Sequence, residues 1–362
     1  MKRFKQILSG LLVTVLMTST CLNASFAVSI DNQSLIYREI EKSLSAIIPE
    51  KEYYGLGDVD MGNLSIGEKI PTYEVVDGNL QPTSVSLYPI FDNTGALAVV
   101  AATSTVNGEI IVSISQTFVD TLRLLAPDSQ ISIIYDKNAA YLLSDGTLTK
   151  LTEYSYKTYF DRDDIETLTE NSLASLYGTA LSANKRLSVA NLPKPYGGEG
   201  DEEIYLSVPK KTQPSGSLIC WAACCASIIS YIYNRNYDTV WMAEQYGSMD
   251  REDAEDVLKF INNFFAVDYK YSYTNDYINI WTSLCAYKPV YGAFQDMKDS
   301  EKAHALVIRG ISYWSVFSVM DPGSGIYATG KINGSGTWTS FDYVSARTGN
   351  EYFLWEYLYG SK

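Results

Sequence analysis

Residues 213–227 read Gln213-Pro-Ser-Gly-Ser-Leu-Ile-Cys220-Trp-Ala-Ala-Cys-Cys-Ala-Ser227. The Ser-Gly-Ser within this stretch is typical of a turn, and the run that follows, from Ile219 to Tyr233, is almost entirely apolar. A helix that is hydrophobic on all sides lies in a protein core rather than on its surface. The stretch therefore predicts a buried helix that begins close to Cys220.

The position of Cys220 favours a reactive thiol. At a helix N-terminus the unpaired N–H groups and the positive end of the helix dipole stabilise a thiolate, which lowers the pKa of a cysteine there. Cys224 lies one turn further along the same face, where the dipole effect has decayed. We therefore expect Cys220 to be a nucleophile and keep Cys224 as the alternative.

His304 is the only histidine in the chain and is the candidate base for a thiol nucleophile. It precedes the apolar run Ala305–Ile308, which predicts a strand, and the strand predicted at 290–294 could pair with it. Asp321 ends the next predicted strand. Because a hairpin of two such strands brings its open ends together, Asp321 is placed to orient the imidazole.

These segments resemble the papain-like cysteine peptidases, with a closer likeness to the bacterial branch that has a C39-like catalytic domain. The resemblance covers residues 205–362. It rests on Gln213, on Cys220-Trp-Ala-Ala at a helix start, on Ala303-His304-Ala-Leu-Val-Ile-Arg-Gly and on Val319-Met-Asp321-Pro.

The resemblance implies a role for each matching position. Cys220 would be the nucleophile, His304 its base, Asp321 the residue that orients the imidazole, and Gln213 a side-chain donor to the oxyanion hole. The third position is often Asn in the papain group and often Asp in the C39-like group, so Asp321 favours the latter.

Each of these residues has an ordinary explanation when taken alone. Asp321-Pro-Gly is typical of a turn, Gln213 is a loop amide, Trp221 is a large core residue, and a lone histidine is more often structural than catalytic. What is specific is their conjunction in this order along one chain.

Residues 1–27 predict a signal peptide that is cleaved after Ala27. A basic start and a short apolar run at residues 7–17 precede Ser25-Phe-Ala27, the small residues that a signal peptidase needs. We expect a secreted, extracellular protein; a lipid anchor at Cys21 is the alternative. No other apolar run is long enough to cross a bilayer, so we expect no stable membrane insertion after cleavage.

The chain carries 28 Lys and Arg against 42 Asp and Glu, a net charge of −14. Loss of a basic signal peptide makes the mature chain still more acidic, which argues against nucleic acid as a partner. The acidic excess is concentrated in residues 28–203, whereas residues 204–362 are nearly balanced. This difference favours two domains, each with its own core.

Four cysteines remain after export. Cys220, Cys224 and Cys225 lie on one predicted helix, where they cannot bridge one another with good geometry. A bridge from Cys224 or Cys225 to Cys285 is one alternative. Their apolar neighbours favour the other, in which these cysteines are small buried hydrophobic residues.

Residues 28–190 predict an α+β domain, made of a helix over residues 35–48 and one antiparallel sheet. Strands are predicted at 69–76, 85–91, 97–103, 109–115, 131–135, 139–143 and near 148, with hairpin turns at Asp77-Gly, Asn107-Gly and Asp145-Gly. Two further helices are predicted at 116–126 and 164–187.

This N-terminal domain has no histidine, no cysteine after export, and no metal, phosphate or nucleotide motif, so we expect no chemical role for it and no cofactor. It resembles the folded propeptides of bacterial papain-like enzymes, which assist folding and occlude the cleft. The resemblance implies a zymogen that its own prodomain inhibits. An adhesion or carbohydrate-binding module is the alternative.

Residues 191–203 are rich in proline, glycine and acidic residues and predict an exposed linker that is open to proteolysis. In the domain from 204 to 362, helices are predicted at 238–246, 251–265 and 276–287, and strands at 290–294, 305–313, 315–320 and 351–358. Helices first and an antiparallel sheet second is the order of the papain-like fold.

The sequence therefore predicts a secreted cysteine peptidase, made as a zymogen, that acts on peptide or protein substrates through an acyl-enzyme. An acyltransferase or amidase that uses the same residues is the second hypothesis. The third is a non-catalytic binding or toxin-like protein that keeps the fold, although such a protein would be expected to lose at least one of the four positions.

Overall fold

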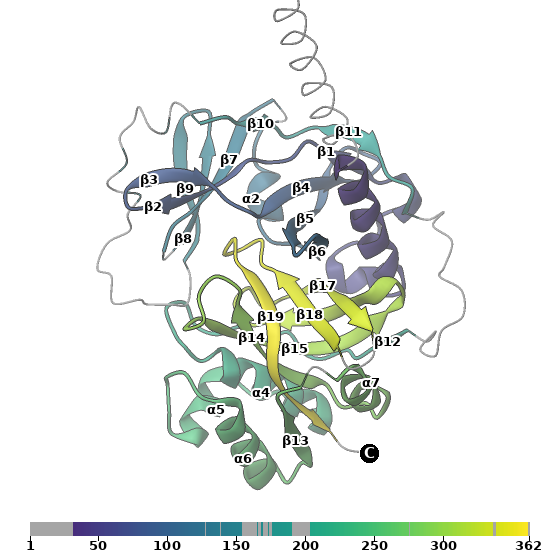
Figure 1. Cartoon of the computed structure of the whole chain (residues 1–362), viewed down its shortest axis with the longest axis vertical. Helices are drawn as coiled ribbons and strands as arrows, with labels where there is room; N and C mark the ends of the chain where they lie inside the picture. Colours follow the sequence, from purple (N-terminus) through teal and green to yellow (C-terminus); the bar gives the residue numbers. More distant parts are fainter. Residues whose placement is uncertain are drawn as a thin grey trace, which may run out of the picture.

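A computed structural model of the chain describes residues 32–126, 128–137, 139–153, 165, 168, 173, 176–189, 203–274, 276–335 and 338–360. The predicted signal peptide (1–27) and residues 191–202 of the predicted linker lie outside the described residues. Helices and strands are mixed in an α+β architecture. We call residues 32–189 the N-terminal half and residues 203–360 the C-terminal half; they are the upper and lower parts of Figure 1.

The N-terminal half begins with a helix over residues 32–46. It stops before Pro49, as predicted, and a 3-10 helix, η1 (Ile48–Tyr54), follows. The other elements are η2 (Met61–Asn63), β1 (Ser65–Gly67), β2 (Thr72–Val76), β3 (Asn79–Pro82), β4 (Ser86–Phe91), β5 (Leu97–Val106), β6 (Glu109–Ser115), α2 (Val119–Leu122), β7 (Gln130–Tyr135), β8 (Ala139–Ser144), β9 (Thr147–Glu153), β10 (Thr179–Ala180) and β11 (Ala183–Arg186).

The three predicted hairpin turns are confirmed. Asp77-Gly78 joins β2 to β3, Asn107-Gly108 joins β5 to β6, and Asp145-Gly146 joins β8 to β9. Both residues of each turn have positive φ, which the tight turns that suit antiparallel strands require.

The prediction of one antiparallel sheet in this half is wrong, because its strands form two. The order β11-β1-β4-β5-β6 belongs to a large sheet, and β3-β2-β7-β8-β9 with β10 forms a second sheet in which β2 and β7 are parallel. The physical reason is that β4 and β5 are buried along nearly their whole length. The helix over 32–46 covers one face of these strands and the second sheet covers the other.

Two helix predictions are also wrong. The helix expected over 116–126 is reduced to α2, because Phe118 takes a left-handed conformation (φ 67°) and residues before it cannot join the helix. The helix expected over 164–187 is wrong over its second part, where residues 179–180 and 183–186 form strands β10 and β11, which pair with β7 and β1. Most of residues 164–175 lie outside the described residues. Strand β11 is exposed at every position, so it carries no alternating apolar pattern.

The C-terminal half contains the four predicted helices, α4 (Cys220–Tyr233), α5 (Thr239–Tyr246), α6 (Ala254–Phe265) and α7 (Tyr277–Cys285). Asp238 and Asp276 cap α5 and α7 by accepting from backbone N–H groups of the first turn. The strands are β12 (Ile204–Tyr205), β13 (Tyr269–Ser272), β14 (Val290–Asp296), β15 (Ala303–Ser312), β16 (Val316–Asp321), β17 (Ile326–Ser335), β18 (Trp338–Val344) and β19 (Glu351–Gly360), with a short 3-10 turn, η5 (Tyr313–Ser315). No described helix is long and apolar enough to span a membrane.

Strands β14 to β19 form a closed ring. Each pairs antiparallel with the next, and β19 pairs back with β14. The helix α4 packs against β15 and β14 from outside this ring, on the side away from the N-terminal half (Figure 1).

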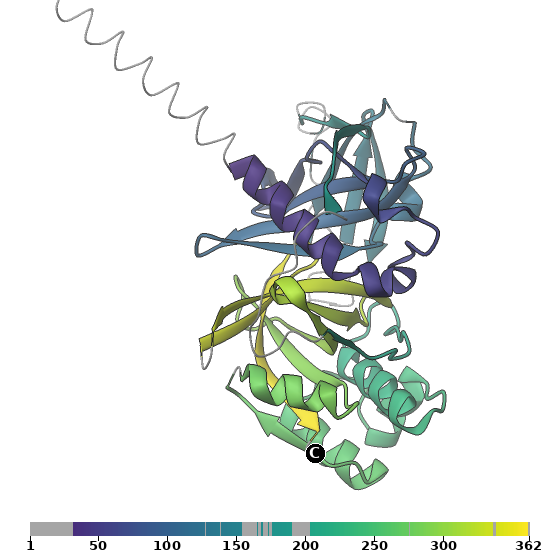
Figure 2. The ribbon, with the colours of Figure 1, turned by 90° about the vertical axis from the view of Figure 1, so that its right-hand side faces the viewer.

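One hydrophobic core extends across both halves. It contains Ile40 and Leu44 of the first helix together with Phe317 and Val319 of β16. The large sheet is also continuous across the boundary, since Ser115 of β6 pairs with Ala328 of β17. Figure 2 shows the first helix running from the N-terminal strands down to the strands of the ring.

A buried arginine joins the halves at this boundary. Arg309 of β15 is fully buried; its Nη2 donates to Glu50 of η1, its Nη1 to Ser318 Oγ at 2.8 Å and its Nε to Leu206 O at 2.8 Å. Its guanidinium lies over the ring of Tyr327, 4.4 Å from the centroid. Glu50 thus supplies the carboxylate that neutralises this charge.

We predict that Glu50→Ala destabilises the protein strongly, since it leaves Arg309 buried without its carboxylate. Removing one partner of a buried ion pair costs about 3–5 kcal/mol. The measurement is the free energy of unfolding in urea. Glu52→Ala is the matched control, because Glu52 is exposed on the same 3-10 helix; equal stability of the two variants would contradict the prediction.

Candidate active site

Cys220 is the first residue of α4, as the sequence predicts. The N-cap residue Ile219 makes no side-chain cap, so no side chain competes for the first N–H groups of the helix. The next ten residues of α4 are buried, whereas Cys220 itself is partly exposed. The helix therefore presents one sulfur at its N-terminus and buries the ten residues that follow it.

His304 is the second residue of β15, and Phe294 of β14 lies opposite it in the ladder. Asp321 is the last residue of β16, the strand that pairs with β15 on its other side. The hairpin brings the two residues into contact: His304 Nε2 lies 2.7 Å from Asp321 Oδ1. Because Nε2 faces the carboxylate, Nδ1 is the ring nitrogen left for Cys220, whose thiol forms a side-chain hydrogen bond with His304.

The turn after β16 fixes the carboxylate of Asp321. Gly323 N donates to Oδ1 at 2.7 Å and Tyr343 Oη donates to Oδ2 at 3.0 Å. A Cβ at Gly323 would lie 3.0 Å from Oδ1 and 2.6 Å from Arg347 Nη1. Only glycine leaves room for both side chains at this point.

Cys220, His304 and Asp321 each shift the pKa of a neighbour toward its charged form. Burial raises the pKa of the Cys220 thiol, but the hydrogen bond and the charge of His304 outweigh it, and the pKa falls below its usual value. Burial lowers the pKa of His304, but the Asp321 carboxylate and the Cys220 sulfur raise it overall. Burial raises the pKa of Asp321, and the imidazolium more than offsets this, so that Asp321 stays ionised.

The other cysteines differ from Cys220. Burial raises the pKa of Cys224 and of Cys225 above the usual value for a thiol, which leaves both protonated and inert. No disulfide joins the four cysteines of the described chain, and Cys285 is exposed while Cys224 and Cys225 are buried. The Cys285 bridge considered from the sequence is therefore absent, and Cys224 is a poor alternative nucleophile.

Gln213 lies beside the turn that carries Asp321, because its backbone N–H donates to Pro322 O at 3.0 Å. Its side chain is largely buried, and its Oε1 is buried without a hydrogen-bond partner among the described residues. A buried amide oxygen with no partner is costly, and such groups are rare away from functional sites. Trp221, in contrast, is a core residue whose indole N–H donates to Asp250 O at 2.8 Å.

Sequence reasoning missed three residues of this site: Tyr343, Arg347 and Tyr352. Tyr352 lies against His304, with ring centroids 6.1 Å apart, and stacks on Tyr343. All three come from β18, β19 and the turn between them. No local motif marks them, because only the closure of the ring brings these elements next to β15 and β16.

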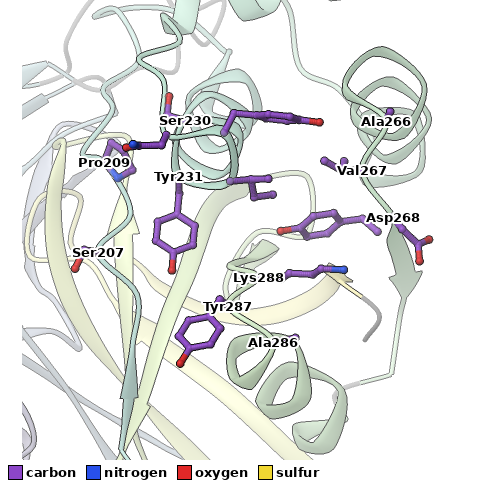
Figure 3. Close-up of a pocket in the computed structure, with 14 residues that line it drawn as sticks. Ser207, Pro209, Ser230, Tyr231, Ala266, Val267, Asp268, Ala286, Tyr287 and Lys288 are labelled. Carbon is purple, nitrogen blue, oxygen red and sulfur yellow. The ribbon is translucent and has the colours of Figure 1, made fainter.

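A separate cavity of about 760 Å³ lies at the opposite end of α4 (Figure 3). The residues that end α4, α6 and α7, namely Asn234, Ala266 and Ala286, all line it. None of Cys220, His304, Asp321 and Gln213 lines it, and its charged residues Asp268 and Lys288 have opposite signs. We therefore assign no chemistry to this cavity.

We predict a single imidazole in the proton NMR spectrum, titrating well above pH 6.5 because Asp321 and Cys220 favour the imidazolium. The midpoint should fall in Cys220→Ala and fall further in Asp321→Asn, since the carboxylate is the larger of the two stabilising charges. A raised histidine pKa adds stability that is complete below about pH 6.5 and is lost as the pH rises through the folded value. Identical titration in wild type and both variants would disprove the pairing.

We also predict that Gly323→Ala impairs the site without unfolding the protein. The new methyl group must displace the Arg347 guanidinium or the Asp321 carboxylate. A displacement of about 1 Å at a reacting group can cost about a hundredfold in rate. The readouts are the imidazole titration and the rate at which iodoacetamide alkylates Cys220. Gly57→Ala is the control, because its Cβ would meet only ordinary contacts; a Gly323→Ala protein that reacts like this control would refute the prediction.

Neither a scan against protein-family models nor a search of the curated proteins gives a match to this chain. The geometry of the site is therefore the basis for its function. That geometry joins a helix N-terminal thiol, an imidazole and a buried carboxylate in one hydrogen-bonded series.

Proposed function

We propose that this protein is a papain-like cysteine peptidase that hydrolyses peptide bonds with Cys220, His304 and Asp321. The observation that carries the proposal is the hydrogen-bonded series from the Cys220 thiol through His304 to Asp321, with the 2.7 Å contact between His304 Nε2 and Asp321 Oδ1. A nucleophile, a base and a third group that orients the base are the parts that acyl transfer requires.

The arrangement of elements supports a papain-like fold. Helices α4, α5 and α6 come first, α4 carries the thiol at its N-terminus, and the later antiparallel strands β15 and β16 carry the imidazole and the carboxylate. The thiol and the base thus come from two different structural layers.

Acylation starts from the thiolate–imidazolium pair that the site favours. The Cys220 sulfur attacks the peptide carbonyl carbon, and the electron pair of the C=O bond moves to oxygen. His304 then gives its Nδ1 proton to the leaving amine, the C–N bond breaks and a thioester remains. Asp321 keeps Nε2 hydrogen-bonded throughout, so the ring holds the orientation that the proton transfer needs.

The oxyanion is held by the Cys220 backbone N–H and by the side-chain amide of Gln213. The first of these donors is one of the uncapped N–H groups of α4. The backbone of Gln213 is held next to the site because its N–H donates to Pro322 O. In the second half of the reaction, water loses a proton to His304 and attacks the thioester carbonyl. The C–S bond then breaks, which releases the acid and regenerates the thiolate–imidazolium pair.

We further propose that the protein is secreted and processed in the linker, with the N-terminal half as a regulatory segment. The composition of residues 1–27 and 191–203 supports both steps. The common core bears on how such a segment could act. Separation of the halves would divide this core, to which Ile40 and Leu44 of the first helix and residues of β16 both belong, and would expose apolar surface.

We predict that Cys220→Ala lowers the rate of peptide hydrolysis by several orders of magnitude, since a triad without its nucleophile retains only residual activity. Cys224→Ala is the matched control one turn along α4 and should keep the chemistry at some cost in packing. Activity is measured on an unstructured protein substrate, and covalent labelling by E-64 is read by mass spectrometry.

The same spectra give the N-terminus of each secreted species. We expect wild type to start between residues 193 and 207 and Cys220→Ala to remain unprocessed. Full activity of Cys220→Ala would refute the proposal, and transfer of the acyl group to an added amine instead of water would identify an acyltransferase.

A further inference from the structure

The turn between β18 and β19 lies between the candidate active site and the N-terminal half. Gly349 N donates to Ser345 O at 2.9 Å and Ser345 N to Asn350 O at 3.0 Å, so the backbone of this turn is closed by its own hydrogen bonds. We call residues 345–350 the β18–β19 turn. It carries Arg347, which no sequence motif marks.

The six-stranded sheet of the N-terminal half holds this turn in place. Tyr135 Oη donates to Ala346 O at 2.8 Å, and the Tyr135 ring lies so close to Gly349 that a Cβ there would be 2.5 Å from it. Arg347 Nε donates to Thr152 Oγ1 at 3.2 Å. The N-terminal half therefore contacts both the backbone of the turn and the guanidinium of Arg347.

The other end of the same guanidinium lies next to the active-site carboxylate. Arg347 Nη1 and Asp321 Oδ1 are both within 3.0 Å of the position that a Cβ would take at Gly323. The positive charge of Arg347 contributes to holding the pKa of Asp321 low, after the larger effects of burial and His304. One side chain thus spans from Thr152 in the N-terminal half to Asp321.

We propose that Arg347 is a positioning residue for Asp321 and that Thr152 anchors it, so that the N-terminal half completes the active site. The inference rests on the proposed peptidase function for its catalytic meaning. It assigns the N-terminal half a constructive role in the working enzyme, in contrast to the inhibitory role that the resemblance implies.

Arg347 adds a permanent positive charge to the groups that face Asp321. The others are His304 from β15, Tyr343 from β18, Tyr352 from β19 and Cys224 from α4. Because Arg347 and the imidazolium share one carboxylate, Arg347 makes the imidazolium a somewhat stronger acid. A stronger acid passes its proton more readily to the leaving amine.

Arg347→Met tests the charge. The imidazole of this variant should titrate with its midpoint at higher pH than in wild type, opposite to the shift expected in Cys220→Ala. The basic limb of the plot of kcat/KM against pH should move to higher pH with it. We expect kcat/KM at neutral pH to fall about tenfold, since Asp321 loses one of its restraints. Arg347→Lys keeps the charge and should leave the midpoint close to that of wild type. A role confined to stability would move neither the midpoint nor the basic limb.

Thr152→Val tests the anchor from the N-terminal half. It should shift the imidazole midpoint in the same direction as Arg347→Met but by less, and it should add nothing in the Arg347→Met background, because the two changes break one chain of contacts. Thr149→Val is the matched control: Thr149 lies on the same strand, β9, and is exposed. Thr152→Ser keeps the hydroxyl and should behave as wild type.

The titration and the alkylation of Cys220 need no peptide substrate, so this test stands apart from that of the proposed function. Loss of hydrolysis in every protein, with the predicted midpoint shifts intact, would refute the peptidase proposal alone. Wild-type midpoints in folded Arg347→Met and Thr152→Val, with hydrolysis intact, would overturn the role of Arg347. Circular dichroism establishes that each variant is folded, and Thr152→Val decides the question by itself if Arg347→Met does not fold.

Discussion

The buried charge of Arg309 constrains the arrangement of the whole molecule. A guanidinium with no exposed surface must be neutralised and fully hydrogen-bonded, or it cannot be buried at all. Its carboxylate comes from Glu50 in the N-terminal half, while its other partners, Ser318 and Leu206, come from the C-terminal half. Arg309 lies on β15, the strand that also carries His304. Burial of the strand that carries the base therefore depends on a residue 259 positions away in the sequence.

The thiols of α4 differ in pKa although burial acts on both in the same direction, and this contrast explains why one cysteine is suited to chemistry. Cys220 and Cys224 are one turn apart, and burial alone would raise the pKa of both. Only Cys220 has the imidazolium of His304 beside it, and that charge reverses the effect of burial. The apolar surroundings strengthen this effect, because opposite charges attract more strongly where water is excluded.

The sequence predicted the elements whose signals are local. The apolar run from Ile219 and the Asn-Gly and Asp-Gly turns each act within a few residues, and each was placed correctly. The missed features depend on distant partners. Strand β11 has no apolar face because it pairs only at a sheet edge. Tyr343 and Arg347 reach Asp321 only because β18 closes the ring of strands.

The shared core opposes separation of the N-terminal half from the C-terminal half after cleavage of the linker. A propeptide that only fills a cleft can leave by breaking surface contacts. This half instead pairs β6 with β17, contributes Ile40 and Leu44 to the common core and neutralises Arg309. Separation would expose apolar side chains, each worth about 1.5–3 kcal/mol of burial, and would leave a buried cation without its carboxylate. Cutting the linker removes none of these contacts. A nicked chain would therefore stay associated, and regulation would have to act by opening access to Cys220 while both halves remain together.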